Sequence, residues 1–189
     1  MQISLENEFD VLQEVGEGWF AKVFLVEHRK SRSELVLKAI HKDSTSKKDL
    51  IREFHYSYNL GILNNSRVIV RTFDILFESK DCFLFAQEYA PFGDLTSNVS
   101  EIGIGEIYAK KVARQLATAL DFMHDHDLVH RDVKLDNVLV FKSDFSKVKL
   151  ADFGECRRRG AAVVRFNEWV PYCPPEIIDT AQGMWSLAI

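Results

Sequence analysis

Short apolar segments alternate with polar turns through the first half of the chain, a pattern that predicts β-strands. Five segments are rich in β-branched, aromatic or aliphatic residues: 9–15, 23–26, 35–40, 68–77 and 82–88. A glycine turn connects the first two segments and a polar turn connects the last two. The pattern therefore predicts a β-rich region at the start of the chain.

Two segments repeat apolar residues at helical spacing. In segment 47–60, Leu50, Phe54 and Ser57 would lie along one face of a helix. A second helix, long and largely buried, is predicted for 104–124 from its apolar residues Tyr108, Val112, Leu116, Ala119, Leu120 and Met123. Histidine and aspartate alternate in 124–127, but no further metal ligand is close in sequence. The end of a helix is therefore favoured there over a metal site.

One lysine, Lys38, lies inside the apolar segment 35–40. A lysine among aliphatic side chains is costly to bury unless its charge is paired. Glu53, in the predicted helix 47–60, is the expected partner, with Glu34 and Asp49 as lesser alternatives. The competing interpretation of Glu53 is a solvated charge on the helix surface.

Charged residues gather between two short apolar segments in 128–140. The sequence there reads H-R-D-x-K-x-x-N, beginning at His130 and ending at Asn137. A group of charged and polar residues between two strands is typical of a catalytic loop. A second short strand, 148–150, is followed by Asp152, Phe153 and Gly154. An ordinary solvated turn is the alternative, and the companion motifs at suitable distances disfavour it.

Composition narrows the choice of partners and compartment. The 189 residues carry a formal net charge of −4, whereas a general nucleic-acid surface would need a basic excess. We therefore expect no nucleic-acid partner, and we interpret Arg157–Arg159 as a local anion site or a solvated loop. Cys82, Cys156 and Cys173 are few and widely spaced, which favours a reducing compartment. No signal peptide or membrane-spanning segment is predicted, so we expect a cytoplasmic location and no membrane partner.

The motifs, taken in order, resemble those of the protein kinase superfamily. They are the glycine turn 16–23, Lys38 in its strand, the H-R-D-x-K-x-x-N loop and the D-F-G tripeptide. The runs 128–134, 148–158 and 170–177 are most similar to the SH3-domain-binding serine/threonine kinase family. The resemblance implies an α+β, two-lobed fold with a β-rich N-lobe and a mainly helical C-lobe. The implied divisions are a leader 1–8, an N-lobe 9–86, a hinge 87–93 and a partial C-lobe 94–189.

The same resemblance implies an ATP-dependent protein serine/threonine kinase that uses ATP and Mg²⁺. Asp132 would accept or orient the proton of the substrate hydroxyl, and Lys134 would neutralise the γ-phosphoryl group. Asn137 and Asp152 would bind Mg²⁺. His130 and Phe153 would pack beneath the site as scaffold. The implied ATP-binding residues are Val15, Gly16, Gly18, Ala21, Val23, Lys38, Glu53, Glu88, Ala90 and Leu139.

Several positions depart from the family pattern. Ala21 replaces the third glycine of the turn, and Pro174 replaces the alanine of the A-P-E box at 174–176. Gln87 stands at the gatekeeper position, where a buried amide would need a hydrogen-bond partner. No Ser, Thr or Tyr lies between Gly154 and Tyr172, so activation through a phosphorylated residue and Arg131 has no acceptor. Trp169 replaces the threonine that commonly contacts the catalytic aspartate.

The last residues, 184–189, resemble the start of the central C-lobe helix, with Gly183 in place of its aspartate. We therefore expect a C-terminally truncated lobe in which Leu116 and Leu120 lose their cover. The expected partner is a protein substrate with a Ser or Thr hydroxyl. SH3-domain partners are a further expectation, although the single P-x-x-P, at 171–174, falls inside the activation segment. The alternative functions are a non-catalytic nucleotide-binding or interaction module, and a chain that does not fold stably alone.

Overall fold

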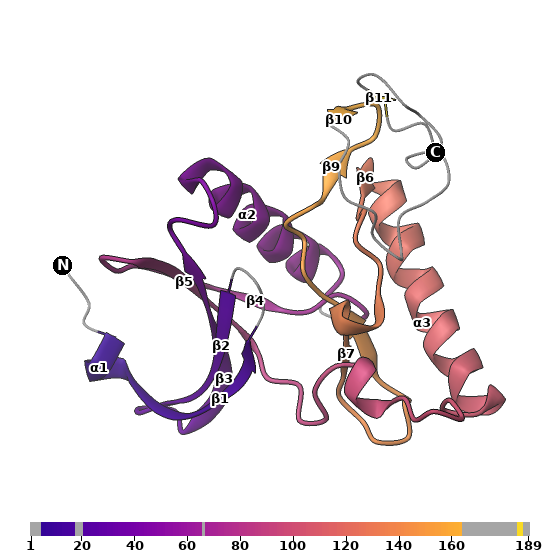
Figure 1. Ribbon diagram of the computed structural model, residues 1–189, viewed down its shortest axis with the longest axis horizontal. Helices are drawn as coiled ribbons and strands as arrows, with labels where there is room; N and C mark the ends of the chain where they lie inside the picture. The colour runs from indigo at the N-terminus through magenta and orange to yellow at the C-terminus, as the bar shows by residue number, and fades with distance from the viewer. Residues whose placement is uncertain (1–4, 18–20, 66, 164–184, 187–189) are drawn as a thin grey trace.

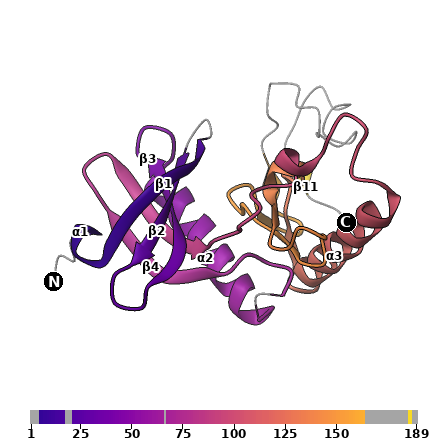
Figure 2. The same ribbon diagram turned by 90° about the horizontal axis from the view of Figure 1, so that it is seen from below.

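The computed structural model describes residues 5–17, 21–65, 67–163 and 185–186. Two lobes lie side by side in both views, one built around a five-stranded sheet with helix α2 and the other around helix α3 (Figures 1 and 2). The described residues thus form the predicted α+β, two-lobed fold. Among them, no helix is both long enough and apolar enough to cross a lipid bilayer.

The sheet of the first lobe confirms the five predicted strands. Its members are β1 (Phe9–Glu17), β2 (Ala21–His28), β3 (Ser33–His41), β4 (Thr72–Glu78) and β5 (Cys82–Glu88), in the order β1-β2-β3-β5-β4. All neighbouring strands are antiparallel. A four-residue helix that had not been predicted, α1 (Leu5–Glu8), precedes β1.

Strand β4 begins later than predicted, at Thr72 instead of Val68. The residues before it turn away to the second lobe. Leu150 donates its N–H to the Val68 carbonyl at 2.8 Å and accepts the Val70 N–H at 2.9 Å. Pairing with Leu150 therefore removes 68–70 from the sheet and gives the two lobes a shared backbone contact.

Helix α2 (Lys47–Leu63) lies against one face of the sheet (Figure 1). Ser46 caps its N-terminus by accepting the Asp49 N–H at 3.1 Å. The predicted face is confirmed, since Leu50 is buried and Phe54 packs edge-on against Phe85 of β5. Near its C-terminal end, a Cβ on Gly61 would lie 3.0 Å from the Val70 carbonyl oxygen, so the glycine allows helix and strand segment to approach closely.

The second lobe contains α3 (Glu106–Asp125), two single-turn 3₁₀ helices (Thr96–Asn98 and Leu135–Asn137) and short strands. These strands are β6 (Leu128–Val129), β7 (Val138–Val140), β8 (Val148–Leu150), β9 (Arg157–Arg158), β10 (Ala162–Val163) and β11 (Trp185–Ser186). Pairing is antiparallel between β6 and β9, β7 and β8, and β10 and β11. The helix predicted from residue 184 is therefore wrong for Trp185 and Ser186, which form a strand.

Helix α3 ends at Asp125, as predicted, but the expectation that it is largely buried is wrong. Val112, Ala119 and Met123 are its buried residues, because the helix packs on one side against β6 and β8. Leu116 and Leu120, which were predicted to lose their cover, are partly buried and pack against the core. The predictions for Gly18, Trp169, the 171–176 region and Gly183 lie outside the described residues.

Candidate active site

The predicted catalytic loop lies between two short strands, as expected. Strand β6 leads into it and β7 follows it, and each is anchored by pairing with a neighbouring strand. The 3₁₀ turn 135–137 brings the end of the loop back towards its beginning. Arg131 (φ 72°) in this loop and Asp152 (φ 63°) after β8 both have left-handed backbone conformations. Such conformations are uncommon for residues other than glycine and concentrate at functional sites.

Asp132 is the centre of a compact polar arrangement. Its carboxylate Oδ2 accepts the Asn137 side-chain amide at 2.8 Å and lies 2.9 Å from Lys134 Nζ. The same Asn137 nitrogen donates to the Asp132 carbonyl at 2.7 Å. The aspartate is therefore held through both its backbone and its side chain, at one end of a carboxylate–ammonium pair.

Backbone contacts bring the two predicted metal ligands to neighbouring positions. The Asn137 carbonyl accepts the N–H of Ala151, the residue before Asp152, at 2.9 Å. Because the Asn137 amide nitrogen is bonded to Asp132, the side-chain oxygen is the atom that Asn137 can offer a cation. Together with the Asp152 carboxylate, this is a hard oxygen set of the size Mg²⁺ uses when phosphates and waters complete its shell. The two residues fit the predicted cation.

His130 and Phe153 form the floor beneath the loop, as predicted. The His130 Nε2–H donates to the Ala151 carbonyl at 3.0 Å, and its Nδ1 accepts the Asp132 N–H at 3.3 Å. The imidazole packs edge-on against the Phe153 ring, with 5.3 Å between ring centroids. Burial lowers the pKa of His130, so the neutral ring that these two hydrogen bonds require is favoured.

The predicted pair of Lys38 and Glu53 is confirmed: Lys38 Nζ lies 2.7 Å from Glu53 Oε1 and 3.3 Å from Asp152 Oδ1. Burial alone would lower the pKa of Lys38, but the two carboxylates outweigh it and raise that pKa. The Lys38 charge holds the pKa of Asp152 below its usual range. For Glu53 burial is the stronger effect, and it raises the pKa of this carboxyl despite the ammonium.

The glycine turn connects β1 and β2. Gly16 pairs with Val23, and a Cβ on Gly16 would meet the Val23 side chain at 3.5 Å, an ordinary contact. Val15 is partly exposed, and Ala21 and Val23 are half-buried on β2. Among the described residues, nothing would sterically prevent a side chain larger than hydrogen at position 16. Gly18, the second glycine of the turn, lies outside the described residues.

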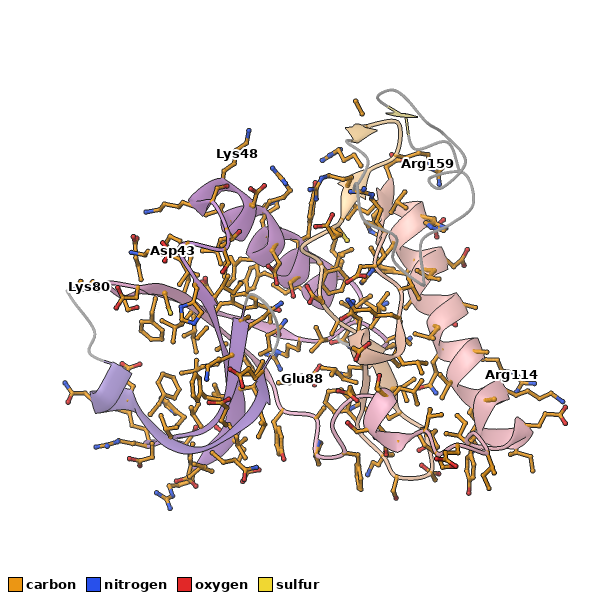
Figure 3. All side chains as sticks on the ribbon, viewed as in Figure 1. Asp43, Lys48, Lys80, Glu88, Arg114 and Arg159 are labelled. Carbon is orange, nitrogen blue, oxygen red and sulfur yellow. The ribbon has the colours of Figure 1, made fainter. Side chains whose placement is uncertain are left out.

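The predicted hinge, 87–93, includes Glu88, which lies between the two lobes (Figure 3). Its carboxylate forms an ion pair with Lys149 of β8, and the same oxygen accepts the Arg71 N–H at 2.6 Å. Lys149 is 1% exposed, and its Nζ lies 4.7 Å from the centroid of the Phe141 ring. The pairing was missed from the sequence, although a lysine in a short apolar strand is the same signal that identified Lys38.

The last residues of the predicted hinge, Phe92 and Gly93, are hydrogen-bonded to β7. Ala90 is buried and accepts the Gly93 N–H at 3.1 Å, and Leu139 forms a β-bridge with Asp94. The Phe92 N–H donates to the Val140 carbonyl at 3.2 Å. Ala90 and Leu139, both predicted to contact nucleotide, are thereby brought to adjoining segments.

The partners required by the buried Gln87 are present. Its side-chain amide donates to Ser57 Oγ at 3.1 Å and to Thr72 Oγ1 at 3.0 Å. A third hydrogen bond joins the two hydroxyls. Neither Ser57 nor Thr72 was predicted to take this role, since each is an ordinary residue of a helix or a strand.

Arg131 also has an acidic neighbour that was not predicted. Its Nη1 lies 3.4 Å from both the carboxylate Oε2 and the carbonyl oxygen of Glu155. The Arg131 side chain is largely buried, and the β6–β9 pairing places Arg157, two residues after Glu155, opposite Val129. The segment after D-F-G is thus attached to the catalytic loop by both a side chain and a strand.

Comparison with known proteins agrees with this geometry. The family model described as "Protein kinase domain" matches residues 9–189. The chain is 38% identical over 178 residues to serine/threonine-protein kinase meng-po of Drosophila melanogaster, covering 94% of this chain and 38% of the relative. It is 38% identical over 194 residues to serine/threonine-protein kinase SBK1 of Mus musculus, covering 97% of this chain and 46% of the relative.

A solved structure of another protein also matches this chain. A crystal structure of Rad53 1–466 in complex with AMP-PNP matches with a TM-score of 0.73 and 28% sequence identity, over 93% of this chain and 43% of that chain. The chain therefore spans less than half the length of each of these three proteins.

Proposed function

Since the chain belongs to the protein kinase family, we propose that it transfers the γ-phosphoryl group of Mg-ATP to serine and threonine hydroxyls of proteins. The observation that carries the proposal is the Asp132 carboxylate, which contacts both the Lys134 ammonium and the Asn137 amide. Phosphoryl transfer needs a positioned acceptor for the hydroxyl proton and nearby positive charge. One loop of this chain brings both together.

In the proposed reaction, Asp132 accepts the proton of the attacking hydroxyl and aims its oxygen at the phosphorus. The Lys134 ammonium lies against the same carboxylate and would offset negative charge as the transferred group moves. A lysine two residues after the catalytic aspartate is typical of serine/threonine kinases, and the relatives named above are serine/threonine kinases. The acceptor is therefore proposed to be a serine or threonine hydroxyl.

The proposed nucleotide site lies between the lobes. Lys38, held by Glu53, would bind the α- and β-phosphates. The glycine turn, with Val15, Gly16, Gly18, Ala21 and Val23, would cover the nucleotide from above. Segment 87–93 would act as the hinge, with Glu88 and Ala90 offering backbone groups to the adenine and Leu139 packing from below.

Asp152 and Asn137 would hold Mg²⁺ through their oxygen atoms. The ion supplies positive charge that neutralises the β- and γ-phosphates during transfer. The lowered pKa of Asp152 means that its carboxylate is ionised and ready to bind a cation at neutral pH. The proposed protein substrates are not restricted further, and an SH3-domain partner stays a prediction because residues 171–174 lie outside the described residues.

The test is phosphoryl transfer by purified 1–189 from Mg-ATP to a serine- and threonine-containing peptide library. In Asp132→Asn, transfer should fall at least about 100-fold, because a positioned base is worth that much. Asp136→Asn is the matched control, since Asp136 is exposed in the same loop and should keep activity. Nucleotide binding without transfer in the unsubstituted chain would instead support the alternative of a non-catalytic binding module.

A further inference from the structure

A cluster of three polar side chains is buried where helix α2 packs on the sheet. Ser57 is 1% exposed, Thr72 is 2% exposed and Gln87 is 9% exposed. They come from three different elements: α2, β4 and β5. We call these residues the polar cluster. A buried polar group is costly unless it is bonded, so three of them at one contact need an explanation.

Within the polar cluster each residue is bonded to the other two. The two N–H groups of the Gln87 amide go to different hydroxyls, one to Ser57 at 3.1 Å and one to Thr72 at 3.0 Å, and the hydroxyls bond each other. Hydrogen bonds weaken steeply when their geometry is distorted, whereas apolar contacts tolerate sliding. The polar cluster therefore specifies the position of α2 along and around its own axis.

The polar cluster is directly linked to the proposed nucleotide site through the helix. Ser57 follows Glu53 by four residues, one helical turn, so both side chains lie on the same face of α2. Across the sheet, Gln87 pairs with Val36, two residues before Lys38 on the same strand, and therefore shares a sheet face with Lys38. Helix and sheet thus meet at two polar contacts one turn apart: Lys38 with Glu53, and Ser57 with Gln87 and Thr72.

We propose that the polar cluster positions Glu53, so that the Lys38–Glu53 pair is held in place for nucleotide binding. The three residues are positioning residues: they act through α2 and not by contact with the nucleotide. This inference deepens the proposed function and rests on it for its consequence. Losing one hydroxyl should let α2 shift and leave Lys38 less tightly held.

The first measurement is Mg-ATP affinity of purified 1–189. Ser57→Ala should raise the dissociation constant roughly three- to tenfold, the fold-change that corresponds to one hydrogen bond. Ser46→Ala is the matched control, because it removes a serine hydroxyl at the N-terminus of the same helix, away from the polar cluster. It should lower Tm and leave the affinity unchanged. If Ser57→Ala does not fold, Thr72→Val is used in its place, because valine has nearly the shape of threonine and lacks the hydroxyl.

A second measurement follows Lys38 without any nucleotide. Acetylation by dilute acetic anhydride, quantified by mass spectrometry, should be faster at Lys38 in Ser57→Ala than in the unsubstituted chain. Labelling of the more exposed Lys22 should not change. In a Glu53→Gln background, Ser57→Ala should have no further effect on affinity, because the pair through which it acts is already lost.

The outcomes separate the two proposals. Ser57→Ala with a lower Tm, but with the affinity and Lys38 labelling of the unsubstituted chain, would show that the polar cluster is only structural and would overturn the inference. Additive effects of Ser57→Ala and Glu53→Gln on affinity would do the same. Absence of Mg-ATP binding by the unsubstituted chain would refute the proposed function, while Lys38 labelling would still test the positioning of Glu53.

Discussion

Lys149 of strand β8 forms its ion pair with Glu88 of strand β5, so a buried charge of the second lobe meets the end of the first lobe's sheet. Burial lowers the pKa of Lys149, because desolvation outweighs the attraction of Glu88. A buried pair of this kind adds little net stability over apolar side chains, but it is costly to break. Its geometry fixes how the end of β5 meets β8.

Replacing only Lys149 should therefore destabilise the protein. Lys149→Met leaves the Glu88 carboxylate, which is 19% exposed, with the Arg71 N–H and without its ammonium partner. We expect the free energy of unfolding to fall by about 3 kcal/mol, measured by urea denaturation. Lys149→Met with Glu88→Leu should recover most of the loss, since both charges are gone. A single variant as stable as the unsubstituted chain would contradict this.

Neutralising Glu53 should weaken nucleotide binding more than it weakens the fold. Glu53→Gln keeps the shape of the side chain and removes the charge that pairs with Lys38 at 2.7 Å. Mg-ATP affinity should fall about tenfold, as expected when one charge-assisted hydrogen bond is lost. Isothermal titration measures the change. Asp49→Asn, which removes a half-exposed carboxylate from the same helix, should leave the affinity within about twofold.

Glu155 should take part in activity without phosphorylation. No Ser, Thr or Tyr lies between Gly154 and Tyr172, and Glu155 offers its carboxylate to Arg131 at 3.4 Å. We expect phosphatase treatment to leave the transfer rate unchanged. Glu155→Gln should lower the rate about fivefold, a modest loss because the Glu155 side chain is 36% exposed. Glu106→Gln on the exposed face of α3 is the control, and equal rates in both variants would argue against a role for Glu155.

Stability should fall on mild acidification because of His130. Burial places its pKa below the 6.5 of an unfolded histidine, so between those two values the unfolded chain binds more protons. The free energy of unfolding therefore decreases as pH falls below about 6.5. His130→Phe keeps a ring against Phe153 but cannot titrate. Tm curves of the two proteins from pH 7.5 to 5.5 should converge at low pH, whereas parallel curves would contradict the assignment.

Local pattern was sufficient for much of the fold and site. Apolar segments alternating with polar turns predicted the five strands, and the H-R-D-x-K-x-x-N motif predicted that Asp132, Lys134 and Asn137 belong to one loop site. The Lys38–Glu53 pair was predictable because a lysine buried in a strand needs an acidic partner, and Glu53 lies in the next helix.

Other features depend on register between distant segments, which local pattern does not contain. Ser57 and Thr72 meet Gln87 only because β4 pairs with β5 at that position and α2 crosses them there. Helical periodicity likewise showed which residues of α3 share a face, but not how much of the helix its neighbours cover. Trp185 was expected in a helix and lies in a strand, because pairing with Val163 overrides the local resemblance.

The left-handed backbone at Arg131 and Asp152 stores conformational energy at the candidate active site. Each such residue costs on the order of 1–2 kcal/mol relative to a relaxed conformation, less for aspartate than for arginine. The surrounding bonds, from the β6–β9 pairing to the His130 contacts, keep that energy from being released. The strained backbone conformation of the site is therefore maintained only while the neighbouring structure is intact. We therefore expect substitutions that weaken these surrounding contacts to change the conformation of this loop before they unfold the protein.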